Sequence, residues 1–420
     1  MSGGRLEYGE NREVKEMAQK LFDMLNERGF VKDMTHPEQI KELLNGDKKI
    51  AFYLGIDPTA DSLHIGHFFA LRMFRHLQNA GHRGILLIGG ATSMVGDPTG
   101  KSDMRKMLTR EQVEHNLNEV KTLARRFVLP ETEIVNNADW MDKFTYVDFM
   151  RTACVHFNVS VMLASEAYAR RRENGGLTFL EMGYMPMQAY DFVHLHNTKG
   201  CILEIGGSDQ WGNIVAGTEL FRKMNIENGN EKSEIYGLTS PLLMTADGKK
   251  MGKTEKGTLW VARDKTTPFD FYQYFYNTGD ENTEMLLALF TDIPMDEIKE
   301  MCKSDIISAK KRMAFEITKL IHGEELAQQA VDTAAALFGG GGDMQNVPSV
   351  EIEMPEQMGA LDFLCAVGLF DTKSDARRMI EQGGVQIDGE KLTDWRVVIA
   401  KKPEFMVQRG KKTHLKVIVK

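Results

Sequence analysis

The chain has few cysteines, no long apolar run and no acid-poor leading segment. Its 4 cysteines are scattered without a CxxC pair, which argues against a disulfide framework and against a thiolate zinc site. No apolar stretch approaches the roughly 20 residues that a membrane-spanning helix needs. The segment from Met1 to Lys20 carries Glu10, Glu13 and Glu16, unlike a secretion signal or an organellar transit peptide. These absences predict a cytoplasmic protein with no membrane partner.

Histidines in a metal-binding pattern are also missing. The 11 histidines include the pairs His64 with His67 and His194 with His196. Neither pair belongs to an HExxH motif or to a two-plus-two arrangement of ligands. We therefore predict no structural metal site.

What the sequence does have is the length and apolar content for a large core. Its 420 residues are 42% hydrophobic, which predicts two or three folded domains. The net charge of -8 is unevenly spread, because residues 355–420 hold 12 Lys and Arg against 9 Asp and Glu, or +3, which leaves -11 for residues 1–354. A nucleic-acid contact would therefore depend on local basic patches.

Strand patterns alternate with helical patterns in the first half of the chain. Apolar runs at Ile50–Ile56, Ile85–Ile88 and Cys201–Ile205 each end in a loop that contains glycine or proline. A helix is expected from about His64 to Ala80. This alternation predicts a doubly wound, Rossmann-like α/β fold with a mainly parallel sheet, in which ligands bind beyond the carboxyl ends of the strands.

The second half of the chain has a different composition. Residues 266–338 are rich in Glu, Lys, Leu and Met, which predicts an α-helical domain. A run of glycines opens the predicted linker 339–354, and residues 355–420 predict a separate small α/β domain. Residues 1–265 are expected to form the Rossmann-like domain.

The stretch from Val95 to Ser102 comes close to a phosphate-binding P-loop. That motif requires glycine five positions before its Gly-Lys pair, and Val95 occupies this position. Asp97 would also place a carboxylate against a triphosphate. A polar loop with an exposed lysine explains these residues equally well.

Two other loops have the chemistry of an anion site. In the first, Thr59 can donate a hydrogen bond, and Gly66 leaves room for a ligand beside the positive end of the helix expected at His64. The second, Lys250 to Thr254, is a cationic loop that could fold over a pyrophosphate. Taken by itself, the first loop is slightly better explained as a capped helix with two surface histidines. The second by itself is a weak signal, because lysine-rich surface turns are common.

Together, the two loops resemble the two signature sequences of class I aminoacyl-tRNA synthetases. The resemblance rests on His64 to His67 and Lys250 to Thr254, and it extends through Tyr53 to Thr59, Gly89 to Thr92 and Gly206 to Asn213. It covers nearly the whole chain and is greatest for the bacterial-type tyrosyl-tRNA synthetases. It implies ATP and L-tyrosine as substrates, formation of tyrosyl-adenylate, and transfer of tyrosine to the 3' end of tRNA(Tyr). It also implies a homodimer, and Mg2+ that accompanies the triphosphate.

A helix expected from Tyr184 to about Leu195 supports tyrosine as the amino acid. Tyr184, Gln188 and Asp191 share one face of it. A bound ligand would satisfy three polar groups on an otherwise apolar helix better than a core network would. By the resemblance, Asp191 and Tyr53 hold the phenolic hydroxyl. The resemblance also places Gln210 near the reacting carboxyl and assigns the α-ammonium group to Tyr184, Gln188 and Asp97.

The nucleotide site is likewise implied by the resemblance. The catalytic residues are Thr59, His64, His67, Lys101, Arg105, Lys250, Lys253 and Thr254. All of them except His67 would stabilise charge on the departing pyrophosphate, whereas His67 and Asp209 would hold the adenosine and the ribose. The ATP-binding residues are Gly55, Asp57, Gly66, Gly207, Asp209 and Lys253. Catalysis would consist of positioning and electrostatic stabilisation, without a covalent enzyme intermediate.

Three residues depart from the pattern of that family. Leu54 and Ala70 stand where many members place polar residues beside the nucleotide sugar, and Glu204 stands where glutamine is commoner. Because Leu54 and Ala70 have no side-chain donors, ribose binding is expected to be weaker or differently arranged.

The tail resembles a small RNA-binding module that is also found in a ribosomal protein and in RNA-modifying enzymes. A helix capped by Ser374 would present Lys373, Arg377 and Arg378 as a basic edge for the phosphates of folded RNA. A plain solvated helix is the alternative. The helical region 266–338 is implied to bind the anticodon.

The main alternative function is a non-catalytic RNA-binding scaffold with a synthetase-like body. Such a scaffold would not be expected to keep the lysines of the 250–254 loop, both histidines and Asp191. An RNA-modifying enzyme with the same tail would need a catalytic aspartate motif that is not found here. Tryptophan is the nearest competing substrate, but Tyr53 and Asp191 suit a hydroxyl better than an indole.

Overall fold

The computed structural model describes residues 20–99, 107–229, 233–245, 248, 250–254, 257–339, 349–410 and 413–420. Contacts divide them into two compact units. The first holds the described residues of 1–265 and 279–309, and the second those of 266–278 and 310–420. The predicted division at 265, 338 and 354 stays a prediction. No helix within the described ranges is both long enough and apolar enough to cross a membrane.

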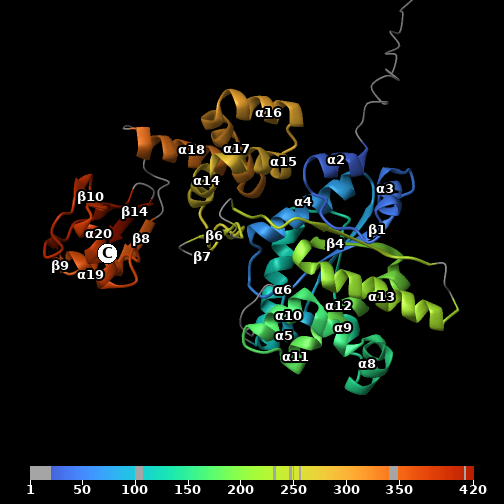
Figure 1. The fold of residues 1–420 in the computed structure, drawn as a ribbon. Helices are drawn as coiled ribbons and strands as arrows, with labels where there is room; N and C mark the ends of the chain where they lie inside the picture. Colours follow the sequence, from blue (N-terminus) through green and yellow to red (C-terminus); the bar gives the residue numbers. More distant parts are fainter. Residues whose placement is uncertain are drawn as a thin grey trace, which may run out of the picture. The chain divides into compact units, whose positions relative to one another are not determined.

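The first unit is built on a five-stranded parallel sheet (Figure 1). Its strand order is β3-β2-β1-β4-β5, so the chain builds outward from β1 on one side and then on the other. Such a reversal leaves a crevice at the carboxyl ends of the two central strands. The predicted doubly wound fold is confirmed. The strands are β1 (Ala51–Ile56), β2 (Arg83–Ile88), β3 (Glu133–Asn136), β4 (Cys201–Gly207) and β5 (Tyr236–Ser240).

Helices and one short hairpin complete the first unit. Between β1 and β4 the chain forms α4 (Ile65–Asn79), α5 (Thr92–Val95), α6 (Arg110–Arg125), α7 (Ala138–Met141), α8 (Tyr146–Thr152), η1 (Cys154–His156), α9 (Val159–Ala164), α10 (Glu166–Glu173), α11 (Phe179–Met182) and α12 (Tyr184–Lys199). The other elements are α2 (Leu21–Glu27), α3 (Pro37–Asn45), η2 (Ser208–Gln210), α13 (Trp211–Glu227), the hairpin of β6 (Lys253–Thr254) and β7 (Gly257–Thr258), η3 (Asp280–Asn282), α15 (Thr283–Phe290) and α16 (Met295–Ser304).

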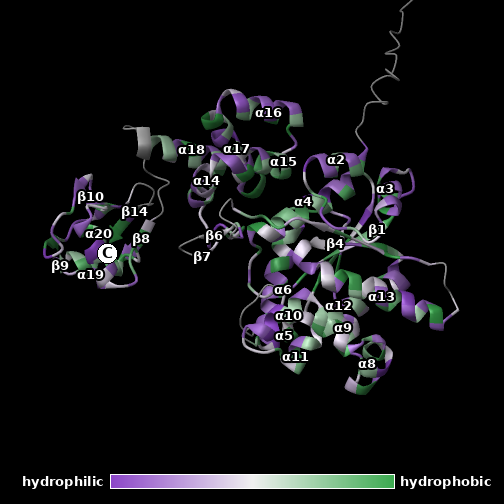
Figure 2. Cartoon of the chain, in the orientation of Figure 1, coloured by the Kyte–Doolittle hydropathy of each residue, from purple (hydrophilic) through white to green (hydrophobic). Residues whose placement is uncertain are grey.

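Helix α12 carries the polar face that was predicted from the spacing of its residues. It begins at Tyr184 and ends at Lys199, and it is followed by Gly200, whose positive φ of 65° stops the helix with a left-handed residue. Its apolar side chains, Phe192 among them, join the core beneath the sheet with Tyr53 and Ile85. Burying each such side chain contributes about 1.5–3 kcal/mol. Figure 2 shows the contrast with outer helices such as α16, where hydrophilic residues dominate.

The predicted helical region is confirmed as helical between Pro268 and Ala336. In the second unit it forms α14 (Pro268–Tyr276) and α18 (Glu324–Gly339), which pack against each other, and most of α17 (Ile306–His322). In the first unit, α15 packs on α4, where the rings of Phe290 and Phe68 stack with their centroids 5.9 Å apart.

The tail forms a small α/β fold with its own apolar core. Its five-stranded sheet has the order β11-β10-β13-β14-β8. The remaining two strands of the tail, β12 and β9, form a separate two-stranded sheet. The stretch predicted as a linker contributes β8, which pairs in parallel with β14. The elements are β8 (Ser349–Ile352), β9 (Gln357–Gly359), α19 (Ala360–Ala366), α20 (Lys373–Glu381), β10 (Val385–Ile387), β11 (Glu390–Lys391), β12 (Val398–Ala400), β13 (Glu404–Arg409) and β14 (Thr413–Val419).

One detail of the tail prediction is wrong. The cap of α20 is Thr372 and not Ser374, because α20 begins at Lys373 and the Thr372 hydroxyl accepts a hydrogen bond from the backbone N–H of Asp375. Both residues can cap a helix. Thr372 is selected because its own backbone is extended, whereas Ser374 already lies inside the helix.

Candidate active site

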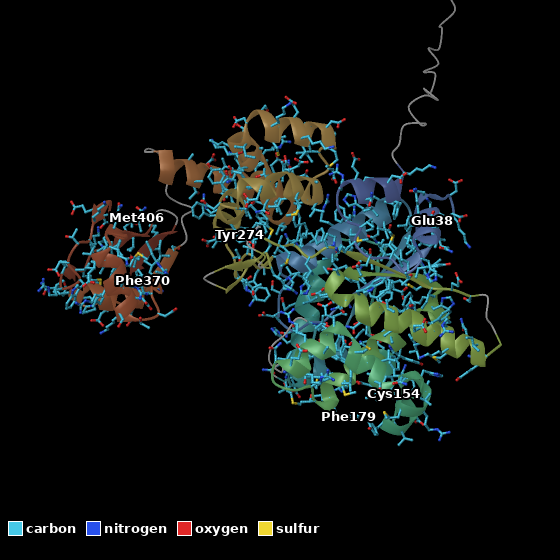
Figure 3. All side chains as sticks on the ribbon, in the orientation of Figure 1. Glu38, Cys154, Phe179, Tyr274, Phe370 and Met406 are labelled. Carbon is cyan, nitrogen blue, oxygen red and sulfur yellow. The ribbon has the colours of Figure 1, made fainter. Side chains whose placement is uncertain are left out.

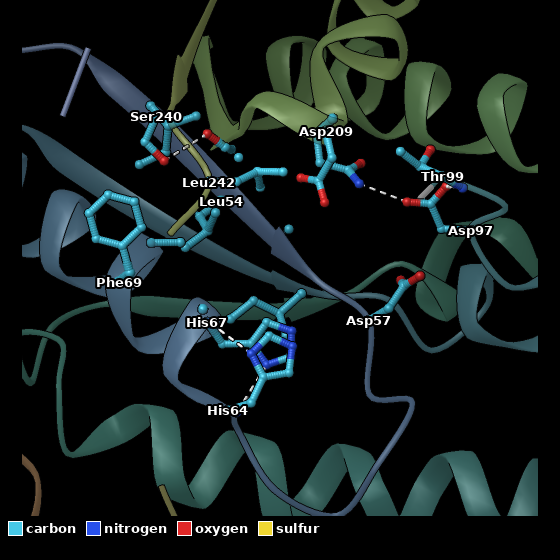
Figure 4. A pocket seen from close by; sticks show the side chains of 18 of the residues that line it. Leu54, Asp57, His64, His67, Phe69, Asp97, Thr99, Asp209, Ser240 and Leu242 are labelled. Carbon is cyan, nitrogen blue, oxygen red and sulfur yellow. Dashed lines mark hydrogen bonds between the residues drawn. The ribbon is translucent and has the colours of Figure 1, made fainter. Parts of the chain in front are cut away.

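A cavity of about 520 Å³ lies at the carboxyl ends of β1 and β4, where the strand order reverses (Figure 4). It gathers residues from β1, α4, α5 and the loop after it, α12, β4 and the loop that precedes the β6–β7 hairpin. All the predicted tyrosine, ATP and catalytic residues whose side chains are described line this one cavity: Tyr53, Gly55, Asp57, Thr59, His64, Gly66, His67, Asp97, Tyr184, Gln188, Asp191, Gly207, Asp209, Gln210 and Lys250.

The side chains of four predicted catalytic residues are not among those that the structure describes. Lys101 and Arg105 lie outside the described residues. Lys253 and Thr254 form β6, of which the backbone is described. The remaining predicted residues divide into three groups, which surround Asp191, Asp97 and His64.

The carboxylate of Asp191 is buried and held by two donors. Asn137 Nδ2 lies 3.0 Å from one oxygen and Trp140 Nε1 lies 2.8 Å from the other. Burial raises the pKa of Asp191 well above its ordinary value, and the two donors act in the opposite direction. Two N–H donors leave lone pairs on both oxygens for a further donor, such as a phenolic hydroxyl.

Tyr53 stands beside this carboxylate on β1. Its ring meets the ring of Phe192 edge-on, with 5.2 Å between the centroids. Burial raises the pKa of the Tyr53 hydroxyl, and the negative charges of Glu204 and Asp191 raise it further. The hydroxyl has no hydrogen bond of ordinary geometry to any described residue. A buried hydroxyl without a hydrogen bond is stabilised when a polar atom of a ligand pairs with it.

Asp57 joins α12 to the loop after β2. Its Oδ2 accepts a hydrogen bond from the Tyr184 hydroxyl at 2.9 Å, and its Oδ1 accepts one from the Thr92 hydroxyl at 2.7 Å. Gly89 is required here, because a Cβ at this position would lie 2.1 Å from the Asp57 Oδ1 atom. The predicted ATP residue Asp57 and the predicted tyrosine residue Tyr184 are therefore parts of one network.

Asp97 is the second acidic group of the cavity. Gln210 Nε2 donates to its Oδ2 at 2.7 Å, and the backbone N–H of Thr99 donates to its Oδ1 at 2.9 Å. Asn213 in turn holds the Gln210 Oε1 atom at 3.1 Å. The P-loop resemblance of this stretch is thus explained differently, because the Asp97 carboxylate faces the cavity as an acceptor.

The two histidines cap α4 reciprocally. The backbone N–H of His67 donates to the His64 ring, and the backbone N–H of His64 donates to the His67 ring. The rings stack with 3.7 Å between their centroids (Figure 4). Gly66 is required between them, because a Cβ there would lie 3.0 Å from the His64 Cε1 atom. The arrangement presents two imidazoles at the positive end of the helix.

Backbone pairing brings the two signature loops together across 190 residues of sequence. The N–H of Ile65 donates to the carbonyl of Leu259, and the N–H of Val261 donates to the carbonyl of Leu63. Gly252, with a φ of 83°, lies against the start of α4, and a Cβ there would approach Ile65 Cγ2 to 2.4 Å. Lys250 and its neighbours therefore face the same cavity as the histidines.

Lys250 and Asp209 bind each other in this conformation. Their Nζ and Oδ2 atoms are 3.0 Å apart, and both side chains are partly exposed. Gly207 makes room for Asp209, because a Cβ there would lie 2.8 Å from the Asp209 Oδ1 atom. The pair would separate if Lys250 followed a phosphate and Asp209 a ribose, at the small cost typical of an exposed ion pair.

Three residues of the site were not predicted from the sequence. Thr92, Asn137 and Trp140 connect Asp57 to Asp191, because Asn137 Nδ2 also donates to the Thr92 hydroxyl at 3.0 Å. The available signal was the pair Asn136–Asn137 at the carboxyl end of the short strand β3, at the same sheet edge as the other loops.

Comparison with known proteins agrees with this geometry. Residues 45–339 match the family described as tRNA synthetases class I (W and Y), and residues 342–417 match the C-terminal domain of tyrosine–tRNA ligases. The tyrosine–tRNA ligase of Clostridium kluyveri is 46% identical over 95% of this chain and 99% of its own. That of Clostridium tetani is 45% identical over 96% of this chain and 100% of its own. This chain belongs to the tyrosine–tRNA ligases of class I.

Solved structures of tyrosine–tRNA ligases share the fold. A C-terminally truncated mitochondrial tyrosyl-tRNA synthetase from Aspergillus nidulans superposes with a TM-score of 0.67 and 28% identity over 78% of this chain and 97% of its own. A tyrosyl-tRNA synthetase from Archaeoglobus fulgidus has a TM-score of 0.56 at 19% identity over 74% of this chain and 99% of its own, which is a likeness of fold. This chain is therefore an ATP-dependent ligase, and such an enzyme has to hold ATP and the amino acid next to each other in one cavity.

Proposed function

We propose that the cavity joins L-tyrosine to ATP as tyrosyl-adenylate and that tyrosine then passes to the 3' end of tRNA(Tyr). The observation that carries the assignment is the buried Asp191 carboxylate, held by Asn137 and Trp140 beside the Tyr53 hydroxyl. A site built around buried acceptors rejects an amino acid whose ring lacks a hydroxyl, because the acceptors would then stay desolvated and unpaired. An indole would offer its N–H from a different position on a larger ring.

The amino-acid end of tyrosine then reaches the middle of the cavity. Tyr184, Gln188 and Asp97 present oxygen atoms to an α-ammonium group, and Gln210 is held by Asp97 where the carboxylate would react. Ligation starts when that carboxylate attacks the α-phosphorus of ATP and pyrophosphate leaves. The negative charge grows on the leaving group, so the donors that matter are those on the nucleotide side.

Those donors are the two histidines and the loop cations. Thr59, His64 and His67 lie at the amino end of α4, and Lys250 approaches from the loop before β6. Lys253 and Thr254 in β6, together with Lys101 and Arg105, complete the proposed catalytic set. One preorganised donor of this kind is worth about 3–4 kcal/mol at a transition state.

The nucleoside is proposed to bind along β1 and β4. Gly55, Asp57, Gly66, Gly207 and Asp209 line this part of the cavity, and Leu54 and Ala70 line it as well. Because Leu54 and Ala70 offer no side-chain donors, the backbone and Asp209 would supply most polar contacts to the sugar.

Magnesium is proposed to arrive with the triphosphate. Within the described residues, no group of three or more His, Cys, Asp and Glu side chains could hold a metal ion. Mg2+ commonly binds through substrate phosphates and water rather than through a protein cage. The ion would neutralise charge on the phosphates, and the residues named above would hold the phosphates in place.

The tail is proposed to bind tRNA through α20, and the helices of 266–338 to bind the anticodon. Lys373, Arg377 and Arg378 are exposed, but each pairs with a carboxylate, of Asp362, Glu381 and Asp375 respectively. Exposed pairs are worth at most about 1 kcal/mol, so RNA phosphates can replace these carboxylates at little cost.

A homodimer is proposed from an exposed apolar surface between α8 and α11. Val155, Val161 and Phe179 are each about two-thirds or more exposed, and Tyr146 and Val147 are similarly open. Phe179 is labelled in Figure 3 at the edge of the first unit. Exposed apolar side chains concentrated in one stretch of chain are typical of a subunit interface. The protein is proposed to act in the cytoplasm.

The test is ATP–pyrophosphate exchange by the full-length protein with each of the 20 amino acids. Tyrosine alone should stimulate exchange, and tRNA(Tyr) should then accept the activated tyrosine. Stimulation by tryptophan in place of tyrosine would overturn the substrate assignment. A folded protein that binds tRNA(Tyr) but supports exchange with no amino acid would instead support the non-catalytic scaffold.

A further inference from the structure

One buried carboxylate of the cavity has no role in the mechanism above. Glu204 lies on β4, is 3% exposed and lines the cavity. A buried carboxylate costs stability unless its contacts compensate, so its contacts indicate its role.

The sheet register places Glu204 directly beside Tyr53. The two residues are partners across the parallel pair β1 and β4, so their side chains leave the same face of the sheet. Helix α12 covers that face and contributes Gln188 and Asp191 to the cavity. Glu204 is therefore surrounded by the residues proposed to bind tyrosine.

Glu204 lies against the Tyr53 hydroxyl and Gln188, and Gln188 makes the hydrogen bond of ordinary geometry. The Gln188 Nε2 atom donates to the Glu204 Oε1 atom at 3.0 Å. The other amide atom, Gln188 Oε1, is buried and has no hydrogen-bond partner among the described residues. Because an ionised carboxylate can only accept, it fixes which end of the amide turns toward it. The acceptor end of Gln188 is left for the ligand.

We propose that Glu204 is a positioning residue for the α-ammonium group of tyrosine, acting by holding the Gln188 amide with its oxygen free to accept from that group. The proposal rests on the proposed role of Gln188 at the ammonium group. Glutamine at position 204 could donate as well as accept, so it would hold either orientation of Gln188. Glutamate therefore selects the productive orientation as long as it is ionised.

The protonation state of Glu204 makes this role depend on pH. Burial raises the pKa of Glu204 to about 7, and the contacts with Gln188 and with the Tyr53 hydroxyl act in the opposite direction. Protonated Glu204 can donate to the Gln188 oxygen, which turns the amide N–H2 toward the ammonium and removes its acceptor. Tyrosine favours the ionised form, so its apparent affinity should rise as the pH rises through 7.

Few other groups around Glu204 titrate. Tyr53 on β1, Asp191 on α12 and Cys201 on β4 interact with its charge. The neighbouring strand β5 contributes Gly237 opposite Glu204, and α13 places Ile214 beside Gly237. His64 and His67 lie in the same cavity on α4. A Glu204 variant is thus needed to identify the group responsible for a pH profile.

The test compares wild-type full-length protein with Glu204→Gln, using the tyrosine KM for ATP–pyrophosphate exchange between pH 6 and 8.5. The wild-type KM should fall about tenfold across this range, a change equal to one hydrogen bond to a charged group. In the variant the KM should be flat, and about tenfold above wild type at pH 8, with kcat little changed. Glu133→Gln, which removes a carboxylate of β3 outside the cavity, should behave as wild type.

Two competitive inhibitors separate positioning from a general effect on the pocket. Tyramine has the ammonium group, whereas 3-(4-hydroxyphenyl)propanoate lacks it. Glu204→Gln should weaken tyramine about as much as tyrosine and leave the propanoate unchanged. In a Gln188→Ala background, Glu204→Gln should have no further effect on the tyrosine KM, because both substitutions remove one interaction.

Equal weakening of both inhibitors, or an inflection near pH 7 that persists in Glu204→Gln, would overturn the proposal for Glu204. Additive effects of the two substitutions would also overturn it. These results leave the proposed function intact as long as tyrosine stimulates exchange in the wild type. If tyrosine gives no stimulation in the wild type, the proposed function and the role of Glu204 both fall.

Discussion

At the scale of single residues, the buried acids of the cavity differ in what holds them. Asp191 receives two N–H donors and is oriented by them, whereas Glu204 receives one N–H donor, from Gln188, and lies against the Tyr53 hydroxyl. The orientation of Asn137 is itself fixed, because its Oδ1 accepts from the backbone N–H of Ala91 at 2.8 Å. The Asp191 carboxylate is therefore held in one orientation, with Asn137 and Trp140 as its fixed donors.

Asp191→Asn should damage tyrosine recognition far more than ATP binding. The new amide N–H2 would face a donor from Asn137 or Trp140, and both of these are fixed in their orientation. We expect the tyrosine KM in exchange to rise about 100-fold, corresponding to roughly 3 kcal/mol, with the ATP KM changed less than about twofold.

The matched control for this variant is Asp139→Asn, which removes an exposed carboxylate from the neighbouring helix α7. Its tyrosine KM should equal that of wild type. A parallel rise of the tyrosine and ATP constants in Asp191→Asn would argue against a role in reading the phenol.

At the scale of elements, the site depends on the contact between the hairpin region and the start of α4. Leu259 and Val261 hydrogen-bond to Ile65 and Leu63, and Gly252 lies against Ile65. The contact joins the two signature loops, so its geometry controls where the loop cations point. Glycine is required at position 252 for two reasons, its positive φ and the lack of space for a Cβ.

Gly252→Ala should lower kcat for exchange by about tenfold or more, since displacing the loop by a fraction of an ångström misplaces the catalytic donors. Gly248→Ala is the control, because Gly248 has a similar φ of 76° but nothing within 4 Å of its Cβ position. Both variants lose about 1 kcal/mol from the left-handed conformation. Equal kcat values for the two would show that the contact with Ile65 is unimportant.

At the scale of the whole molecule, the tail is independent in its packing. Its core cluster is composed of residues between 350 and 419. A truncated mitochondrial relative without its C-terminal part forms a folded structure. Deleting residues 343–420 should therefore leave tyrosine-dependent exchange within about twofold of wild type and lower tRNA(Tyr) charging at limiting tRNA by more than tenfold. Charging at the wild-type rate would refute a role for the tail in RNA binding.

The oligomeric state is a second property of the whole molecule. Val161→Glu places a charge in the exposed apolar stretch between α8 and α11, and it should convert a dimer to monomers in sedimentation velocity at micromolar concentration. Ile307→Glu changes an equally apolar, exposed residue of α17 and should remain dimeric. If both variants sediment as wild type, the interface lies elsewhere.

The sequence determined the chemistry and the fold class of this protein. Local periodicity was enough to predict β1, α4, α12 and the helical region, because strand and helix spacing is written in consecutive residues. The resemblance of the two signature loops to class I aminoacyl-tRNA synthetases then indicated ATP and tyrosine, and the polar face of Tyr184, Gln188 and Asp191 supported tyrosine.

Only the tertiary structure decided which side chains meet. The partners of Asp191 are Asn137 and Trp140, which lie 54 and 51 positions away, and the neighbour of Tyr53 is Glu204 through the register of β1 and β4. The steric need for glycine at 252 arises from Ile65, far away along the chain. Such contacts follow from strand order and register, which depend on the packing of the whole sheet and leave no local pattern in the sequence.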